Sequence, residues 1–168
     1  PSACNTNFNM LEVLRDNFHG NIHLSLGMTT IQEEKKIIQF FAEKNRVNKL
    51  TIYSCTSGYP VAPEDICLLE IERLKKLYSG KVNSLGFSGH HVDTVIDLAS
   101  VVLEVGWIER HFTIDRKWKG TDHSASLEPE GLKRLIQDIH IVCSALTFKE
   151  KEILDIELPQ REKLKFKN

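Results

Sequence analysis

Long apolar runs and an excess of one charge are both missing from this chain of 168 residues. Its richest apolar stretch, residues 98–108, is interrupted by Glu104 and Gly106, whereas a membrane helix needs ~18 apolar residues in a row. The formal net charge of -1 provides no basic surface for nucleic acid or for an anionic membrane. We therefore expect a soluble protein that binds neither nucleic acid nor a membrane.

Paired cysteines are missing as well. The four cysteines are scattered and form no CxxC motif, which favours reduced thiols in a cytoplasmic protein over a disulfide framework. Cys55 and Cys143 lie in apolar patterns, which indicates buried small side chains. No signal-peptide pattern is visible. The chain begins at Pro1 inside a motif-like segment, so we expect it to be part of a longer protein.

The sequence contains no GxSxG, P-loop or Rossmann glycine motif. What recurs is a short apolar strand, then small polar residues, then an amphipathic helix. The expected strands cover residues 21–26, 50–55, 82–88 and 107–113. The expected helices begin near Thr30, Pro63 and Asp93 and after Ser126, and the last one runs to about Leu146. Residues 1–18 predict the end of a strand, a loop and a helix.

Helix signals support these boundaries. Thr30 and Glu33 have the spacing of a capping box. Ile66, Leu69, Leu74 and Leu77 predict the buried stripe of the second helix. In the last helix, apolar residues spaced three or four apart give the clearest helical pattern in the chain, from Leu132 to Leu146.

Side-chain alternation distinguishes between two kinds of parallel sheet. His23 and Ser25 share one face of the first strand, and Glu109 and His111 share one face of the last. The opposite faces are mostly apolar. Doubly wound strands are usually apolar on both faces, whereas a barrel brings polar groups together at its mouth.

The predicted fold class is therefore α/β. We expect the C-terminal half of a (β/α)8 TIM barrel, made of four βα units plus a preceding strand end and helix. This partial barrel covers residues 1–146, and residues 147–168 form a charged C-terminal tail in which we see no chemistry.

His90 and His111 form the sharpest candidate pair, because they end adjacent strands with the same inward parity. Two neutral imidazoles can ligate a divalent metal such as Mn²⁺, Zn²⁺ or Fe²⁺. Glu109 and Asp122 could complete the ligand shell or orient the ligands. On parity alone, two hydrogen-bonded histidines without a metal are an equally good interpretation.

Hydroxyl groups also gather at the strand ends. Ser2, Ser25, Ser57 and Ser88 could hold phosphate or carboxylate oxygens. Each serine alone is more typical of a turn, but together they favour an anionic substrate. Tyr59 could donate a hydrogen bond to substrate or could simply pack.

Six segments follow one another in a fixed order with characteristic spacing: PSA at 1–3, SLGM at 25–28, CTSGYP at 55–60, GFSGH at 86–90, ERHFT at 109–113 and TDHSASLEP at 121–129. This order closely resembles the N-acetylneuraminate (sialic acid) synthase family, including its spore-coat polysaccharide relatives. The resemblance spans roughly residues 1–146.

The resemblance implies an enzyme that condenses phosphoenolpyruvate with N-acetylmannosamine or a related N-acyl amino sugar and releases phosphate. It implies that His90 and His111 bind a divalent metal, Mn²⁺ or Mg²⁺, which acts as a Lewis acid on the sugar aldehyde. It also leads us to expect a homodimer, and a segment that is inactive without the other half of the barrel.

Individual roles follow from the same resemblance. Ser2, Ser25 and Ser88 match positions around phosphoenolpyruvate, and Ser57 and Tyr59 match positions near the acceptor sugar. The candidate catalytic residues are Cys4, Glu109 and Asp122. Three positions depart from the family pattern: many members have an acidic residue at Cys4, asparagine at Ser57 and aspartate at Gly89, which bears on proton transfer and on the identity of the acceptor.

Two rival interpretations stay open at this point. One is another metal-dependent sugar enzyme on the same barrel, such as an isomerase or an aldolase-type enzyme. The other is a non-catalytic, truncated module that assembles with a partner, which would have to cover its open strand edges.

Overall fold

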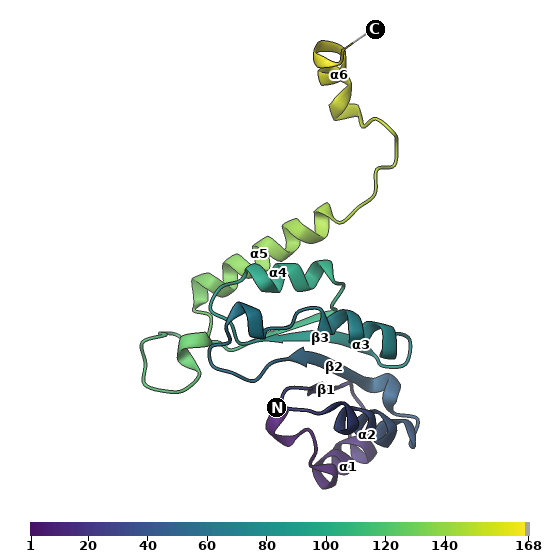
Figure 1. The fold of residues 1–168 in the computed structure, drawn as a ribbon, viewed down its shortest axis with the longest axis vertical. Helices are drawn as coiled ribbons and strands as arrows, with labels where there is room; N and C mark the ends of the chain where they lie inside the picture. The colour runs from purple at the N-terminus through teal and green to yellow at the C-terminus, as the bar shows by residue number, and fades with distance from the viewer. Residues whose placement is uncertain (167–168) are drawn as a thin grey trace.

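The computed structural model describes residues 1–166 as an α/β fold with one four-stranded parallel sheet (Figure 1). The strands are β1 (Ile22–Ser25), β2 (Leu50–Cys55), β3 (Ser84–Gly89) and β4 (Trp107–Arg110), and their order in the sheet is their order in the chain. The helices are α1 (Phe8–Asn17), α2 (Ile31–Ala42), α3 (Glu70–Tyr78), α4 (Val95–Val102), α5 (Pro129–Ala145) and α6 (Leu158–Leu164). The expected succession of βα units is confirmed.

The sheet is strongly curled, as its inner face shows. The rings of His23 on β1 and Trp107 on β4 meet edge to face with centroids 4.8 Å apart. Neighbouring strands lie about 4.8 Å apart, so the first and last of four strands would be separated by roughly 14 Å in a flat sheet. The four strands therefore form a curled half-barrel, with these two side chains on its concave side.

The strand register sorts the side chains as alternation predicts. Ser25 pairs with Tyr53 across β1 and β2, Cys55 pairs with Ser88 across β2 and β3, and Ser88 pairs with Glu109 across β3 and β4. These residues share the concave face. The opposite face carries the apolar side chains of Leu24, Ile52 and Phe87. They pack with buried helix residues, chiefly Ile37 and Phe41 of α2 and Ile71 and Leu74 of α3.

The expected strand end at residues 1–4 was wrong. Ser2–Cys4 forms a 3-10 turn, η1, in which the Cys4 amide donates to the Pro1 carbonyl at 3.0 Å. The backbone groups of this segment are thus satisfied locally rather than in the sheet.

The predicted helix from Pro63 is split in two. Pro63–Asp65 forms a 3-10 turn, and Cys67 with φ of 50° breaks the helical path before α3 begins at Glu70. Leu69 and Leu77 are therefore exposed, contrary to prediction, and the buried stripe of α3 consists of Ile71, Leu74 and Tyr78.

The two cysteines predicted to be buried also differ from expectation. Cys143 is exposed and Cys55 is half-buried. Cys143 lies on α5, of which Leu135 is the buried residue because α4 covers only one side of this helix. Beyond α5 the chain runs away from the sheet to α6 (Figure 1). Among residues 1–166, no helix is both long and apolar enough to cross a membrane.

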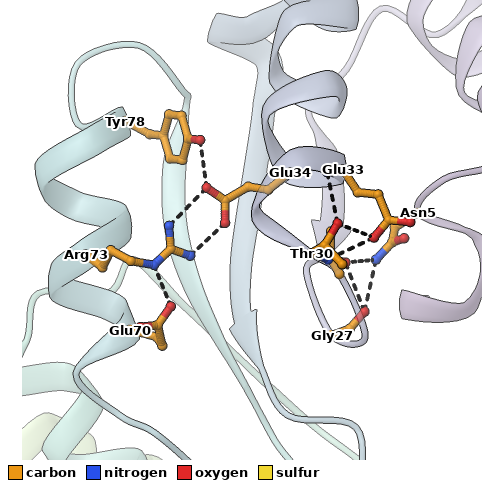
Figure 2. Close-up of polar contacts among 9 residues, drawn as sticks. Asn5, Gly27, Thr30, Glu33, Glu34, Glu70, Arg73 and Tyr78 are labelled. Atoms are coloured by element: carbon orange, nitrogen blue, oxygen red, sulfur yellow. Dashed lines mark hydrogen bonds and ion pairs between the residues drawn. The ribbon is translucent and has the colours of Figure 1, made fainter.

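A partly buried ion pair between Glu34 and Arg73 joins α2 to α3 (Figure 2). The Glu34 side chain, 4% exposed, accepts hydrogen bonds from both terminal nitrogens of Arg73, at 3.1 and 2.7 Å, and from the Tyr78 hydroxyl at 2.7 Å. Burial raises the pKa of Glu34, but these hydrogen bonds outweigh it and hold the pKa below its ordinary value. The N-terminus of α2 carries the predicted Thr30–Glu33 capping box.

The Glu34 contacts generate a stability prediction. Glu34→Gln removes the buried carboxylate that accepts from Arg73 and Tyr78, whereas Arg73 keeps its pair with Glu70. We therefore expect the free energy of unfolding at pH 7 to fall by about 1.5–3 kcal/mol in urea denaturation. The matched control is Arg134→Gln, which breaks the surface Arg134–Asp138 pair on α5 and should cost less than about 0.5 kcal/mol.

The loss of unfolding free energy in Glu34→Gln depends on pH, and the sign of this dependence follows from the pKa of Glu34. Because the folded-state pKa of Glu34 is lowered, its contribution is present above the unfolded value near 4.5 and is lost as pH falls through the folded value. The difference in the free energy of unfolding between wild type and Glu34→Gln should therefore become smaller as the pH falls. A difference that stays constant down to pH 2 would contradict this assignment.

Candidate functional site

Small polar side chains cluster where β1 and β2 end. The Ser2 hydroxyl lies 2.8 Å from the Ser25 hydroxyl and 3.8 Å from the Cys55 sulfur, which in turn lies 3.9 Å from the Ser57 hydroxyl. Three of the predicted serines are thus linked through Cys55. The cluster provides several short-range donors in one place, as an anionic ligand requires.

Two residues outside the candidate set shape this cluster: Gly27, which follows the first strand in the SLGM segment, and Asn5, which sequence reasoning missed. Gly27 lies so close that a Cβ there would sit 2.3 Å from the Ser57 oxygen and 2.5 Å from the Ser2 oxygen. Buried Asn5 donates to the carbonyls of Ser25 and Gly27, each at 3.1 Å, and to the Thr29 hydroxyl at 2.5 Å. The loop after β1 is therefore fixed against the loop that carries Ser2.

His90 is the more buried member of the candidate pair. It is 6% exposed, and its Nδ1 lies 2.9 Å from the Thr56 carbonyl oxygen. Since a carbonyl only accepts, this contact places a proton on Nδ1. In the neutral ring, Nε2 then keeps its lone pair for a ligand. The Cys55 sulfur lies 3.9 Å from the same Nδ1.

Titration of the two neighbours is linked. Burial raises the pKa of the Cys55 thiol, but hydrogen bonds from His90, Ser25 and Ser2 outweigh it and lower the pKa to about 7. Burial lowers the pKa of His90, but the thiol and the Thr56 carbonyl outweigh it and raise the pKa above its ordinary value. Cys55 is thus a polar member of the cluster and not the inert small side chain that its apolar surroundings predicted.

Three rings face one another at the ends of β2, β3 and β4. The His90 and His111 centroids are 5.2 Å apart, and the Tyr59 ring lies 4.6 Å from the first and 5.5 Å from the second. The structure thus brings the predicted pair together. Imidazole nitrogens bind divalent metals at about 2.1 Å, so two rings on one ion have centres only a few ångströms apart, as these do.

The acidic candidates Asp122 and Glu109 lie near the two histidines but form no hydrogen bond with either ring. Asp122 Oδ2 lies 3.8 Å from His111 Nδ1, and Glu109 Oε1 lies 3.4 Å from the Ser88 hydroxyl. In the part of the chain that the structure describes, no three His, Cys, Asp or Glu side chains converge as a metal-ligand set. Within the described residues, the candidate ligands are therefore the two imidazoles. Water or substrate would fill the other coordination positions of a bound ion.

Cys4 lies on η1 and is half-buried. Its backbone bonds to Pro1 and Asn7, and its thiol makes no hydrogen bond to any residue between 1 and 166. The structure therefore does not place Cys4 in the network that links the other candidates. The signal for Cys55, by contrast, was present in the sequence, since Cys55 shares the inward parity of its register partner Ser88.

A cavity of about 470 Å³ lies on the other side of Cys55, between the loops after β1 and β2 and helices α2 and α3. Its lining includes Ser57 and Arg73, and the guanidinium is already paired with Glu34 and Glu70. Neither histidine of the pair lines this cavity. The candidate site is therefore the mouth of the half-barrel, where the strand ends meet.

Parallel βα units with polar groups at the carboxyl ends of their strands define the class: barrel-type α/β proteins with a site at the strand ends. Residues 1–151 match the model of the NeuB family. The chain therefore belongs to the NeuB family, as its ordered motifs predicted.

Curated relatives agree with this assignment. The chain is 38% identical over 141 residues to human N-acetylneuraminate-9-phosphate synthase, covering 84% of this chain and 38% of that protein. It is 32% identical over 141 residues to N,N'-diacetyllegionaminic acid synthase of Legionella pneumophila, covering 82% and 39% respectively. The chain thus spans less than half the length of these relatives.

Solved structures share the fold. The N-acetylneuraminic acid (sialic acid) synthetase of Leptospira borgpetersenii, in complex with citrate, superposes with a TM-score of 0.80 at 27% identity, covering 99% of this chain and 57% of that one. The spore coat polysaccharide biosynthesis protein spsE of Bacillus subtilis superposes with a TM-score of 0.74, also at 27% identity, covering 88% and 42%.

The close packing at Gly27 generates a prediction. Gly27→Ala forces the Ser2 and Ser57 hydroxyls and the Cys55 thiol apart, so we expect a loss of about 1–3 kcal/mol in the free energy of unfolding. Gly131→Ala is the control, because its Cβ would meet only Leu127 at 3.7 Å and alanine favours the helix. Equal stability of the two variants in urea denaturation would show that the cluster is loosely packed.

Proposed function

We propose that the intact protein condenses phosphoenolpyruvate with N-acetylmannosamine or a related N-acyl amino sugar, and that this chain supplies the C-terminal half of its (β/α)8 barrel. The observation that carries the proposal is the meeting of His90 and His111 beside the serine cluster, in a chain whose residues 1–151 match the NeuB family. In the reaction, the enol carbon attacks the sugar aldehyde, water adds, and phosphate leaves.

His90 and His111 would hold a divalent metal, Mn²⁺ or Mg²⁺. The donor set fits such an ion, because the Thr56 carbonyl fixes the proton of His90 on Nδ1 and the two rings are close. Asp122, whose carboxylate lies 3.8 Å from His111 Nδ1, would orient that ring once a hydrogen bond forms between them. When bound, the metal would polarise the aldehyde oxygen of the acceptor sugar.

The serine cluster suits an anionic substrate. The Ser2 and Ser25 hydroxyls lie 2.8 Å apart, and Ser88 lies near the carboxyl end of β3. Their hydroxyls can donate to carboxylate or phosphate oxygens of phosphoenolpyruvate, but neutral donors alone do not balance its charge. The remaining cations would then come from the other half of the barrel, so this segment alone is expected to be inactive.

The acceptor sugar would lie toward Ser57 and Tyr59. Burial, and then the nearby charges of Cys55, Asp122 and Glu109, raise the pKa of Tyr59, so its hydroxyl stays protonated as a donor at neutral pH. Of the three candidate catalytic residues, Glu109 beside Ser88 and Asp122 beside His111 adjoin the site. Cys4 has no comparable contact, which favours Glu109 for proton transfer.

Location and assembly belong to the proposal too. Four free cysteines fit the expected cytoplasmic location. We expect the intact protein to be a homodimer. An isomerase or aldolase-type barrel would bind metal and turn over sugar without consuming phosphoenolpyruvate, and a non-catalytic module would do neither.

The first test is phosphate release by the intact protein. With phosphoenolpyruvate, Mn²⁺ and N-acetylmannosamine, we expect release that requires all three components, and a product that contains the carbons of both substrates by mass spectrometry. A panel of N-acyl amino sugars covers the acceptor. No release with any member of the panel would count against the synthase, and sugar conversion without phosphate would favour the isomerase.

The second test concerns the metal. The double variant His90→Ala, His111→Ala should lose bound Mn²⁺, measured by inductively coupled plasma mass spectrometry after equilibration. His140→Ala is the matched control, because His140 is exposed on α5 and should leave the metal content unchanged. Equal metal in the double variant and in wild type would refute the ligand assignment.

A further inference from the structure

A buried charged cluster lies directly behind the histidine pair. It consists of His91, Asp97 and Arg110, whose side chains are 3%, 0% and 3% exposed. His91 follows His90 in the chain, and Arg110 precedes His111. By parity, Arg110 points away from the mouth while its neighbour points into it.

One guanidinium holds several backbone segments together. Nη1 of Arg110 donates to the Asp97 carboxylate and, at 2.8 Å, to the Asp93 carbonyl. Nη2 donates to the His91 carbonyl at 2.5 Å and reaches the Ala125 carbonyl at 3.5 Å. The planar fork of Arg110 thus joins β4 to the loop after β3, to α4 and to the 3-10 turn His123–Ala125.

These contacts fix the parts of the chain that carry the candidate ligands. The loop after β3 begins with His90, whose own carbonyl accepts from the Val61 amide at 3.0 Å. The turn His123–Ala125 is preceded by Asp122, the neighbour of His111. Arg110 is therefore hydrogen-bonded to the backbone beside His90 and close to Asp122, and it directly precedes His111 in the chain.

Stability alone explains this cluster poorly. Burying an ion pair roughly breaks even against apolar packing. Here Arg110 Nε, Asp97 Oδ1 and His91 Nδ1 are also buried with no hydrogen-bond partner among the described residues, a cost that folded proteins usually avoid. What arginine supplies that an apolar residue cannot is a rigid set of donors aimed at fixed carbonyls.

We propose that Arg110, anchored on Asp97, is a positioning residue that sets how the imidazoles of His90 and His111 face each other. The proposal rests on the proposed function in so far as those imidazoles bind the metal. Lysine keeps the charge at this position but loses the fork, so Arg110→Lys should release the carbonyls of His91 and Ala125 and loosen both ring positions.

The test compares Arg110→Lys with Arg73→Lys in the intact protein. Arg73 also pairs with a buried carboxylate, Glu34, but lies on α3 away from the ring pair. Isothermal titration with Mn²⁺ should show a 10- to 100-fold weaker Kd for Arg110→Lys, the usual effect of altering a group that supports metal ligands. Arg73→Lys should lower the melting temperature and leave the Kd for Mn²⁺ unchanged.

A metal-free measurement keeps the two proposals distinguishable. Imidazole resonances of His90 and His111 in metal-free protein should shift in Arg110→Lys and not in Arg73→Lys. Asp97→Asn, which keeps the shape of the anchor, serves as a second variant and should shift the same resonances. If wild type binds no Mn²⁺ but these shifts occur, the metal assignment fails and the positioning role stands. Unchanged resonances and an unchanged Kd in folded Arg110→Lys and Asp97→Asn would overturn the positioning role.

Discussion

The in-register parallel pairing of four short strands is the constraint on which the rest of this structure depends. Pairing Cys55 with Ser88 and Ser88 with Glu109 sets these residues in a row across the sheet, all on its concave face. Because side chains alternate with a period of two, a slip of one residue in any strand would turn its polar set toward the helices. The apolar residues of the opposite face oppose such a slip, since they pack under α2 and α3.

This pairing links packing to chemistry. The carboxyl ends of the strands meet at one edge, so loops that are distant in the chain bring Ser2, Cys55 and His90 into contact. Hydrogen bonds to backbone carbonyls then fix the arrangement: the Thr56 carbonyl accepts from His90, and the Asn5 side chain donates to the carbonyls of Ser25 and Gly27. The geometry of the site thus depends on hydrogen bonds from residues around the reactive groups.

Much of this arrangement could be predicted from the sequence, because it follows from periodic patterns. The β2 bounds, the Thr30–Glu33 capping box and the inward parity of Ser88 and Glu109 rest on spacing within one strand or one turn. The meeting of His90 with His111 follows from that parity together with the adjacency of consecutive parallel strands. The failures have a different cause. Cys67 with its positive φ and the local turn at Ser2–Cys4 depend on backbone geometry that no periodic pattern encodes. The polar role of Cys55 was overlooked, although its inward parity indicated it. The buried Arg110 cluster arises from tertiary contacts.

The central claim is that the ends of β3 and β4 form a metal-bearing half of a synthase site. The most direct measurement is anomalous X-ray scattering from crystals of the intact protein grown with Mn²⁺. The account predicts one manganese peak within bonding distance of Nε2 of His90 and of a ring nitrogen of His111. A fully occupied manganese site elsewhere in the barrel, with these two rings hydrogen-bonded only to protein, would contradict it.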